Sequence, residues 1–160
     1  MMNRAAMCAG TFDPITMGHL DVIERASRIF PRVVIAVATN PGKNLLFSLE
    51  ERIELVREST THLNGIEVDA FDGLLVDFAE SKEVRVIVRG MRAFSDFEYE
   101  FQMALTNRKL KPQIETLFLM PKQDYSYVSS SNVREVARLG GDTSLFVPPP
   151  VQEALRKRFG

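Results

Sequence analysis

The sequence predicts an α/β fold built on a single doubly wound, parallel, five-stranded sheet with helices on both faces. Short apolar runs of strand length, several of them β-branched, alternate with longer segments whose apolar residues recur at helical spacing. Loops containing Gly, Pro or polar residues follow most of these runs. The 160 residues are 45% hydrophobic and 26% charged, values typical of one globular domain, so we expect residues 1–160 to form a single domain.

The first predicted strand and helix flank a polar loop. Residues 5–9 form an apolar run long enough for a buried strand, and residues 20–30 have apolar side chains at positions 22, 23, 26, 29 and 30. Between them, Gly10 allows a tight turn, and Gly18 allows a ligand to approach the helix start, with His19 in the first turn. The free N–H groups and positive dipole end of this helix favour a phosphate group.

The remaining elements continue the alternation. Ser48, with Glu51 three residues later, forms a capping box before one helix, and the serines at 129–131 can cap another. Strands are expected at residues 33–38, 66–71, 84–89 and 115–120, and helices at 49–56, 74–81, 94–110, 132–139 and 151–159. Ligands of doubly wound sheets bind beyond the carboxyl ends of the strands. Four loops should therefore converge on one ligand-binding opening, the mouth of the site. They lie at 11–19, at 43, at 89–92 and after Pro121.

Composition and motifs argue against several classes of protein. The formal net charge of −1 lacks the basic excess that drives nucleic-acid binding, and no apolar run approaches the roughly 20 residues that span a bilayer. We therefore expect the protein to bind neither nucleic acid nor a membrane. The absence of a signal-peptide pattern indicates a cytoplasmic protein. Cys8, the single cysteine, is interpreted as a small buried hydrophobe. The sequence contains no P-loop, Gly-x-Gly-x-x-Gly motif, nucleophile elbow or Cys/His zinc cluster.

The expected mouth gathers cations and hydrogen-bond donors. The cations are His19, Lys43, Arg89 and Arg92, and the neutral donors are Thr11, Ser129, Ser130 and Ser131. This set suits a polyphosphate, and a phosphate nucleophile is already ionised at pH 7, so it requires no general base. Each residue also has a plainer interpretation. A histidine or serine can simply cap a helix, and the two arginines can pair with Asp96 or Glu100.

The loop Gly10-Thr11-Phe12-Asp13-Pro14, followed by Thr16-x-Gly18-His19, resembles the signature of nucleotidyltransferases related to class I aminoacyl-tRNA synthetases. The form with Thr16 resembles the phosphopantetheine adenylyltransferase family. The resemblance continues through residues 89–100, 107–108, 116–121 and 125–137, in the order of that family. It departs from the family pattern at Cys8-Ala9 and Asn44-Leu45, neither of which removes a charged or hydroxyl role.

The resemblance implies a Rossmann-like nucleotidyltransferase that transfers AMP from ATP to 4′-phosphopantetheine, giving dephospho-coenzyme A and pyrophosphate. It implies a homohexamer and raises the question of feedback by coenzyme A. Mg²⁺ is expected with ATP, held by phosphate oxygens, with no metal ligands from the protein. Three alternatives stay open. They are adenylyl or cytidylyl transfer to another phosphorylated acceptor, such as nicotinamide mononucleotide or glycerol phosphate, a nucleotide-binding module without turnover, and an RNA-handling protein, which the near-neutral charge disfavours.

Carried over by position, the resemblance also implies roles for individual residues. The catalytic residues are His19, Thr11, Lys43 and Arg92. The acceptor-binding residues are Thr11, Lys43, Leu75, Arg89 and Asn107. The ATP-binding residues are Gly10, Thr11, Phe12, His19, Arg89, Gly90, Met91, Arg92, Glu100, Pro121, Tyr125, Ser126, Tyr127, Val128, Ser129, Ser130 and Ser131.

Overall fold

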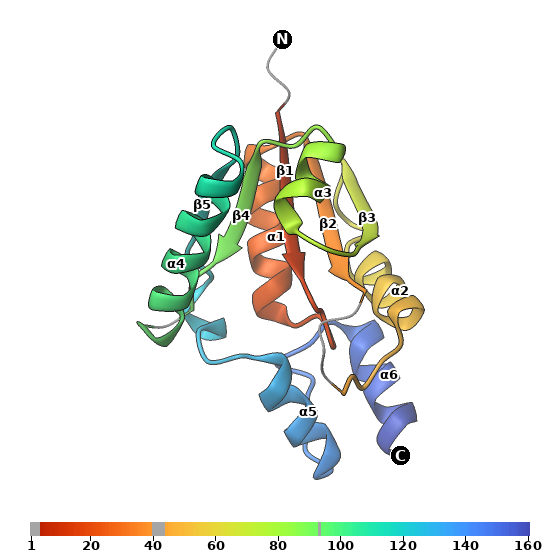
Figure 1. Cartoon of the computed structure of the whole chain (residues 1–160). Coiled ribbons are helices and arrows are strands. Elements are labelled where there is room, and N and C mark those ends of the chain that lie inside the picture. Colours follow the sequence, from red (N-terminus) through yellow and green to blue (C-terminus); the bar gives the residue numbers. More distant parts are fainter. Residues whose placement is uncertain (1–3, 40–43, 93) are drawn as a thin grey trace.

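The sheet has the predicted class and strand number. A computed structural model describes residues 4–39, 44–92 and 94–160, and its five strands are all parallel, in the order β3-β2-β1-β4-β5 (Figure 1). The strands are β1 (Ala5–Gly10), β2 (Arg32–Ala38), β3 (Ile66–Phe71), β4 (Val86–Gly90) and β5 (Glu115–Leu119). The chain adds β2 and β3 on one side of β1, then returns to add β4 and β5 on the other. The switch point of the sheet therefore lies between β1 and β4.

The helices also follow the predicted order. They are α1 (Met17–Ile29), α2 (Leu49–Ser59), α3 (Leu75–Ser81), α4 (Phe94–Leu110), α5 (Ser130–Arg138) and α6 (Pro149–Phe159), with a short 3₁₀ turn, η1 (Gln123–Tyr125), before α5. Among the described residues, no helix is long and apolar enough to cross a membrane.

The starts of α1 and β4 compare differently with the prediction. α1 starts at Met17, where Thr16 caps it, so His19 lies in its first turn as predicted. β4 starts at Val86, two residues later than expected. Glu83 has a φ of 57°, and the Val84 N–H donates to the Ala79 carbonyl of α3, so Val84 is still part of the turn that leaves this helix.

Both faces of the central strands are buried, which explains their continuous apolar sequence. Ala6, Cys8 and Ile35 point to a core shared with α1, α2, α5 and α6. Met7 and Val34, which alternate with them, point to the opposite face, where α3 packs. The carboxyl ends of β1 and β4 emerge between these two layers, and the loops that follow them can reach either face.

Candidate functional site

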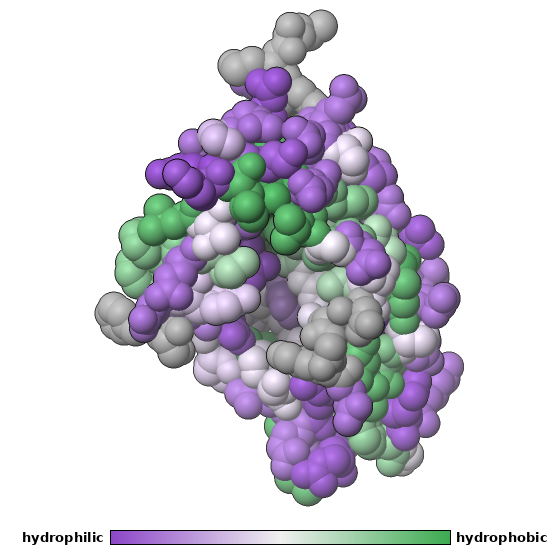
Figure 2. All heavy atoms as spheres, viewed as in Figure 1, coloured by the Kyte–Doolittle hydropathy of each residue, from purple (hydrophilic) through white to green (hydrophobic). Residues whose placement is uncertain are grey.

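A cavity of about 440 Å³ lies beyond the carboxyl ends of β1 and β4, on the α1 side of the sheet. Its polar lining residues come from the β1–α1 loop, α1, the end of β4, the start of α4 and the start of α5. They are Thr11, Thr16, His19, Arg89, Arg92, Asp96, Glu100, Ser129, Ser130 and Ser131. Figure 2 views the opposite face, the one that carries α3, and shows a hollow in its middle. The structure thus brings together in one cavity segments that are far apart in the sequence.

His19 is held by a reciprocal capping interaction at the start of α1. The Thr16 N–H donates to Nδ1 of His19 over 3.0 Å, and the His19 N–H donates to Oγ1 of Thr16 over 3.3 Å. Because a backbone N–H can only donate, Nδ1 must be the unprotonated ring nitrogen. In the neutral ring Nε2 therefore carries the proton and can donate it in a hydrogen bond. The helix-capping interpretation of His19 is correct, and the imidazole also lines the cavity.

The interpretation of His19 as a cation was wrong. Burial, followed by the positive charges of Arg92 and Arg89, lowers the pKa of His19 from 6.5 to about 4. The ring is consequently neutral at physiological pH. It serves the site as a fixed hydrogen-bond donor, and the positive charge in the described part of the cavity comes from the two arginines.

Arg89 is held in place by hydrogen bonds within the protein. Its Nε and Nη2 donate to the two carboxylate oxygens of Glu100 over 3.0 and 2.6 Å, and its Nη1 donates to the Ala9 carbonyl over 2.8 Å. Burial would lower the pKa of Arg89, but the bonds to Glu100 raise it above its ordinary value. This bidentate pair joins β4 to α4 and fixes the guanidinium plane at the end of the sheet.

Arg92 makes a similar bridge further out. Its Nε donates to Oδ2 of Asp96 over 3.2 Å, and its Nη1 donates to the Val128 carbonyl over 2.8 Å. The arginine thus links the start of α4 to the loop that leads into α5. The expected pairing of both arginines with acids of α4 occurs, and both guanidinium groups still line the cavity.

The three serines have distinct roles. Ser129 caps α5 by accepting from the Asn132 N–H, and the Ser130 hydroxyl donates to the Pro14 carbonyl over 2.8 Å. Ser131 accepts from Nη2 of Arg134 over 3.3 Å. All three also line the cavity, so the start of α5 joins the start of α1 as a second source of amide N–H groups.

The turn between β1 and α1 packs an aromatic ring against His19. Phe12 has a φ of 52°, a left-handed conformation that a bulky residue rarely adopts, and its buried ring lies edge-on to the imidazole at 5.0 Å between centroids. A Cβ on Gly10 would lie 3.3 Å from the same ring. Glycine at position 10 therefore lets Phe12 pack closely under the β1 end while supporting His19.

A second cavity, of about 190 Å³, lies on the opposite face of the sheet, between α3 and α4. Its walls are largely apolar and include Phe71, Leu75 and Met103, with Asn107 and Thr116 as polar groups. The two cavities share Ala9, Gly10, Thr11, Arg89 and Glu100. They therefore meet at the carboxyl ends of β1 and β4.

Some predicted site residues lie elsewhere. Met91, Tyr125, Ser126 and Tyr127 line neither cavity, and Tyr127 packs edge-on against Phe146. Lys43 lies outside the described residues, so its predicted role stays a prediction. Sequence reasoning assigned no role to Asp13 or Arg52, two buried charged residues behind the cavity. A charged residue inside the apolar face of α2 was the available signal for Arg52.

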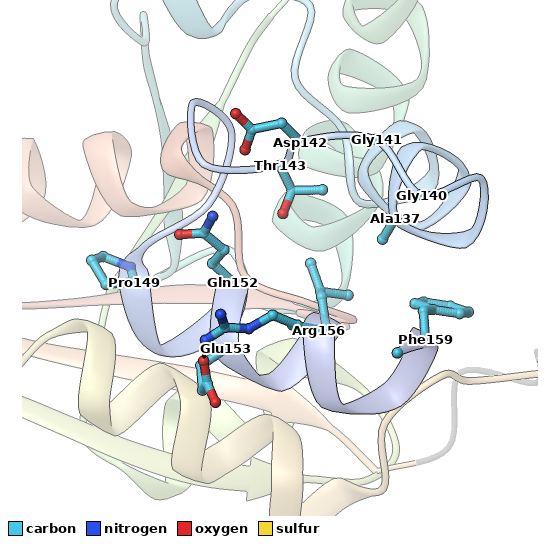
Figure 3. A pocket seen from close by; sticks show the side chains of 12 residues that line it. Ala137, Gly140, Gly141, Asp142, Thr143, Pro149, Gln152, Glu153, Arg156 and Phe159 are labelled. Atoms are coloured by element: carbon cyan, nitrogen blue, oxygen red, sulfur yellow. Dashed lines mark ion pairs between the residues drawn. The ribbon is translucent and has the colours of Figure 1, made fainter.

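Another cavity, of about 540 Å³, lies away from this site, between α5 and α6 (Figure 3). The backbone of Gly140 and Gly141 forms part of its wall, together with Gln152. Its oppositely charged residues Glu153 and Arg156 pair with each other. A polyphosphate would have to break that pair, so this cavity is the poorer candidate.

Within residues 4–39, 44–92 and 94–160, no three His, Cys, Asp or Glu side chains lie close enough together to hold a metal ion. What the cavity offers is two arginines, a neutral histidine, hydroxyls and helix N-termini. That donor set can bind several phosphate groups and stabilise negative charge that develops on them.

Known proteins share the sequence pattern and the fold. The model of the cytidylyltransferase-like family matches residues 7–136. A protein from Vibrio parahaemolyticus described as a nicotinate-nucleotide adenylyltransferase has a similar structure, with a TM-score of 0.75 and 20% identity over 98% of this chain and 93% of that one. A lipopolysaccharide core biosynthesis protein from Thermoplasma volcanium GSS1 has a TM-score of 0.52 and 21% identity over 74% of this chain and 95% of that one. At these identities the two structures establish a common fold.

Proposed function

Because the chain belongs to the cytidylyltransferase-like family of nucleotidyltransferases, we propose that it transfers the adenylyl group of ATP to 4′-phosphopantetheine. The products are dephospho-coenzyme A and pyrophosphate. The observation that carries the choice of acceptor is the pair of cavities that meet at Thr11 and Arg89. The larger is lined by donors that can bind phosphate, and the smaller is largely apolar with polar groups at Asn107 and Thr116.

The smaller cavity suits an aliphatic arm better than a charged pyridine ring. Pantetheine has an aliphatic backbone with two amides, which matches the apolar wall at Leu75 and Met103 and the polar side chains of Asn107 and Thr116. Its terminal phosphate would lie at the junction of the cavities, beside Arg89. The base and triphosphate of ATP would occupy the larger cavity on the α1 side.

The transfer is an in-line displacement that conserves charge and needs no proton transfer. An oxygen of the acceptor phosphate forms a bond to the α-phosphorus of ATP while the bond from that phosphorus to the α,β-bridging oxygen breaks. The electron pair of the broken bond leaves with pyrophosphate. Because the attacking phosphate is already ionised, the protein has to align the two phosphates and stabilise the charge between them.

The residues divide this work by position. His19 would donate its Nε2 proton in a hydrogen bond to an α-phosphate oxygen, with Thr11 beside it. Arg92 and the start of α5 would bind the departing β- and γ-phosphates, and Arg89 would orient the acceptor phosphate. Lys43, predicted as a further catalytic and acceptor-binding residue, belongs to this proposal on sequence grounds alone.

Mg²⁺ is proposed to enter with ATP. The donor set of the cavity is cationic and neutral apart from two carboxylates, Asp96 and Glu100, which both pair with arginines. Such a site fits a Mg²⁺ ion held by phosphate oxygens and water better than one held by protein ligands. When bound, the ion would reduce the charge on the triphosphate.

The acceptor is identified by comparing candidate substrates one at a time. Purified protein is incubated with ATP, Mg²⁺ and one of 4′-phosphopantetheine, nicotinate mononucleotide, nicotinamide mononucleotide or glycerol phosphate, and pyrophosphate is measured. We expect 4′-phosphopantetheine to give the highest kcat/KM. A higher value for a pyridine mononucleotide would favour the activity for which the Vibrio structure is described, and would overturn the proposed acceptor.

A substitution of His19 distinguishes an enzyme from a binding module. His19→Ala should lower kcat far more than it lowers ATP affinity, because the contact it removes is strongest in the transition state. His62→Ala is the matched control, since His62 lies on the surface and pairs with Glu24. Equal losses of turnover and affinity in His19→Ala would contradict the assigned role.

We further propose that the protein is a cytoplasmic homohexamer and that coenzyme A, which contains the product, competes at the same site. Apolar side chains exposed on α4 support self-association: Phe97, Phe101 and Leu105 are about half exposed, and the two phenylalanine rings stack at 5.6 Å. Sedimentation velocity of the wild type and of Phe101→Glu tests the assembly. Titration with coenzyme A in the pyrophosphate assay tests the competition.

A further inference from the structure

Arg52 is a charged residue in the interior of the protein. It lies behind the nucleotide cavity, our name for the cavity of about 440 Å³ at the ends of β1 and β4 that is proposed to bind ATP. It lies on α2, and 1% of its surface is exposed. Within the described part of the chain, its hydrogen bonds go to three main-chain carbonyls. Nη1 donates to Thr11 over 2.9 Å and to Ala38 over 2.8 Å, and Nε donates to Phe47 over 3.2 Å. One side chain therefore connects the β1–α1 loop, the end of β2 and the segment before α2.

This arrangement costs stability that a different residue would not require. Burying a guanidinium group removes it from water, and a methionine of similar volume could fill the space without that cost. What the arginine adds is a planar fork that holds several acceptors in a fixed geometry. Lysine, with a single terminal nitrogen, could not reproduce the combination of Nε and Nη1 contacts.

A second buried charge completes the connection. The carboxylate of Asp13, 2% exposed, accepts from the Leu46 N–H over 2.8 Å and from the Phe47 N–H over 2.9 Å. The segment around Phe47 is thus bonded both to Asp13 and to Arg52. Burial lowers the pKa of Arg52, and the negative charge of Asp13 acts in the opposite direction.

The carbonyls of the β1–α1 turn are held one after another by side chains from different elements. Arg52 of α2 binds the carbonyl of Thr11, Arg134 of α5 binds that of Asp13 over 2.6 Å, and Ser130 of α5 binds that of Pro14. Only Ser130 among these donors lines the nucleotide cavity. Two of the three donors that fix the turn presenting Thr11 therefore lie outside the cavity.

We propose that Arg52 is a positioning residue for nucleotidyl transfer: it touches no substrate, and it fixes the carbonyl of Thr11 so that this loop meets the α-phosphate in the reactive geometry. The inference rests on the proposed function. It predicts that loss of the fork lowers the rate of the chemical step while ATP still binds, because a small displacement of an aligned group reduces turnover strongly.

The test compares Arg52→Lys and Arg52→Met with Val56→Ala, a control that removes buried volume from the same helix, where Val56 is fully buried. All measurements use a temperature at which circular dichroism shows each variant to be folded. We expect kcat to fall about ten- to a hundredfold in Arg52→Lys, with the KM for ATP changed less than about threefold. Val56→Ala should keep the wild-type kcat. An Arg52→Lys kcat equal to that of Val56→Ala would overturn the proposal.

Amide hydrogen exchange provides a readout that does not depend on turnover. Peptides that cover residues 9–14 and 44–48 should exchange faster in both Arg52 variants than in Val56→Ala, because the bonds from Arg52 to Thr11 and Phe47 are lost and only those of Asp13 still join the two segments. Unchanged exchange in these peptides would overturn the role of Arg52. Absence of pyrophosphate from the wild type with every acceptor would instead overturn the proposed function and leave the exchange result to decide on Arg52.

Discussion

The most direct physical test of the site is the titration of His19. Burial and the two neighbouring arginines lower its pKa to about 4, while in the unfolded chain the ring should titrate near its ordinary pKa of 6.5. At pH 5, about 10% of the rings with a pKa of 4 carry a proton, whereas about 97% of the rings with a pKa of 6.5 do. The protonated fraction of His19 at pH 5 therefore distinguishes the two pKa values clearly.

The measurement is a series of ¹H–¹³C correlation spectra of the imidazole Cε1–H groups between pH 8 and pH 4. The chain has two histidines, so a His62→Gln variant assigns the resonance of His19. In Arg92→Met the pKa of His19 should rise, although burial would still keep it below its usual value. A His19 midpoint at pH 6 or above in the wild type would refute the neutral-donor interpretation.

The same shift has a consequence for stability. Because the folded-state pKa of His19 lies below the unfolded value, the unfolded chain takes up the proton first as the pH falls. The contribution of neutral His19 is complete above pH 6.5 and is lost between pH 6.5 and pH 4, up to about 3 kcal/mol. Urea unfolding of the wild type should show this loss, and His19→Asn should lack it. Parallel pH profiles for the two proteins would contradict the reasoning.

Three other predictions follow from single contacts. In Gly90→Ala the new Cβ would lie 2.7 Å from Cγ2 of Val22, so we expect a loss of about 1–3 kcal/mol in urea unfolding, partly restored by Val22→Ala; a stability equal to wild type would contradict the close packing. Thr16→Ala removes the side-chain cap of α1 and should cost about 1 kcal/mol in the same assay, whereas an unchanged midpoint would mean that the cap is not stabilising. Burial raises the pKa of Cys8 to about 12, so iodoacetamide at pH 8 should label it only in urea, and rapid labelling of the native protein would show that the thiol is accessible.

The sheet could be predicted because its signals are local. The run at residues 33–37 is apolar on both faces, and the structure buries all five residues completely. The rule that parallel strands present ligands at their carboxyl ends then placed Arg89 and His19 at one cavity without any knowledge of contacts. The β4 boundary was missed because the left-handed turn at Glu83 has no clear signature in a residue of that type.

The parts of the site that could not be predicted depend on contacts distant in the sequence. The tautomer of His19 follows from a backbone N–H that binds it, and its low pKa follows from burial beside two arginines. The role of Arg52 depends on carbonyls 41 and 14 residues away along the chain. The division of the site into two cavities depends on which face each side chain of β1 and β4 points to. Periodicity cannot supply these facts, since it assigns a residue to a face without assigning its partner.

The central place of β1 affects how the protein can be made. This strand leaves the ribosome before the other strands of the sheet, yet Cys8 pairs with Ile35 on one side and with Val88 on the other. After β2 has been synthesised, one edge of β1 is covered, but its other edge has no partner until about fifty more residues have been added. An apolar strand with an open edge readily pairs with other chains. The growing polypeptide is consequently most vulnerable to aggregation in the interval between the synthesis of β2 and that of β4.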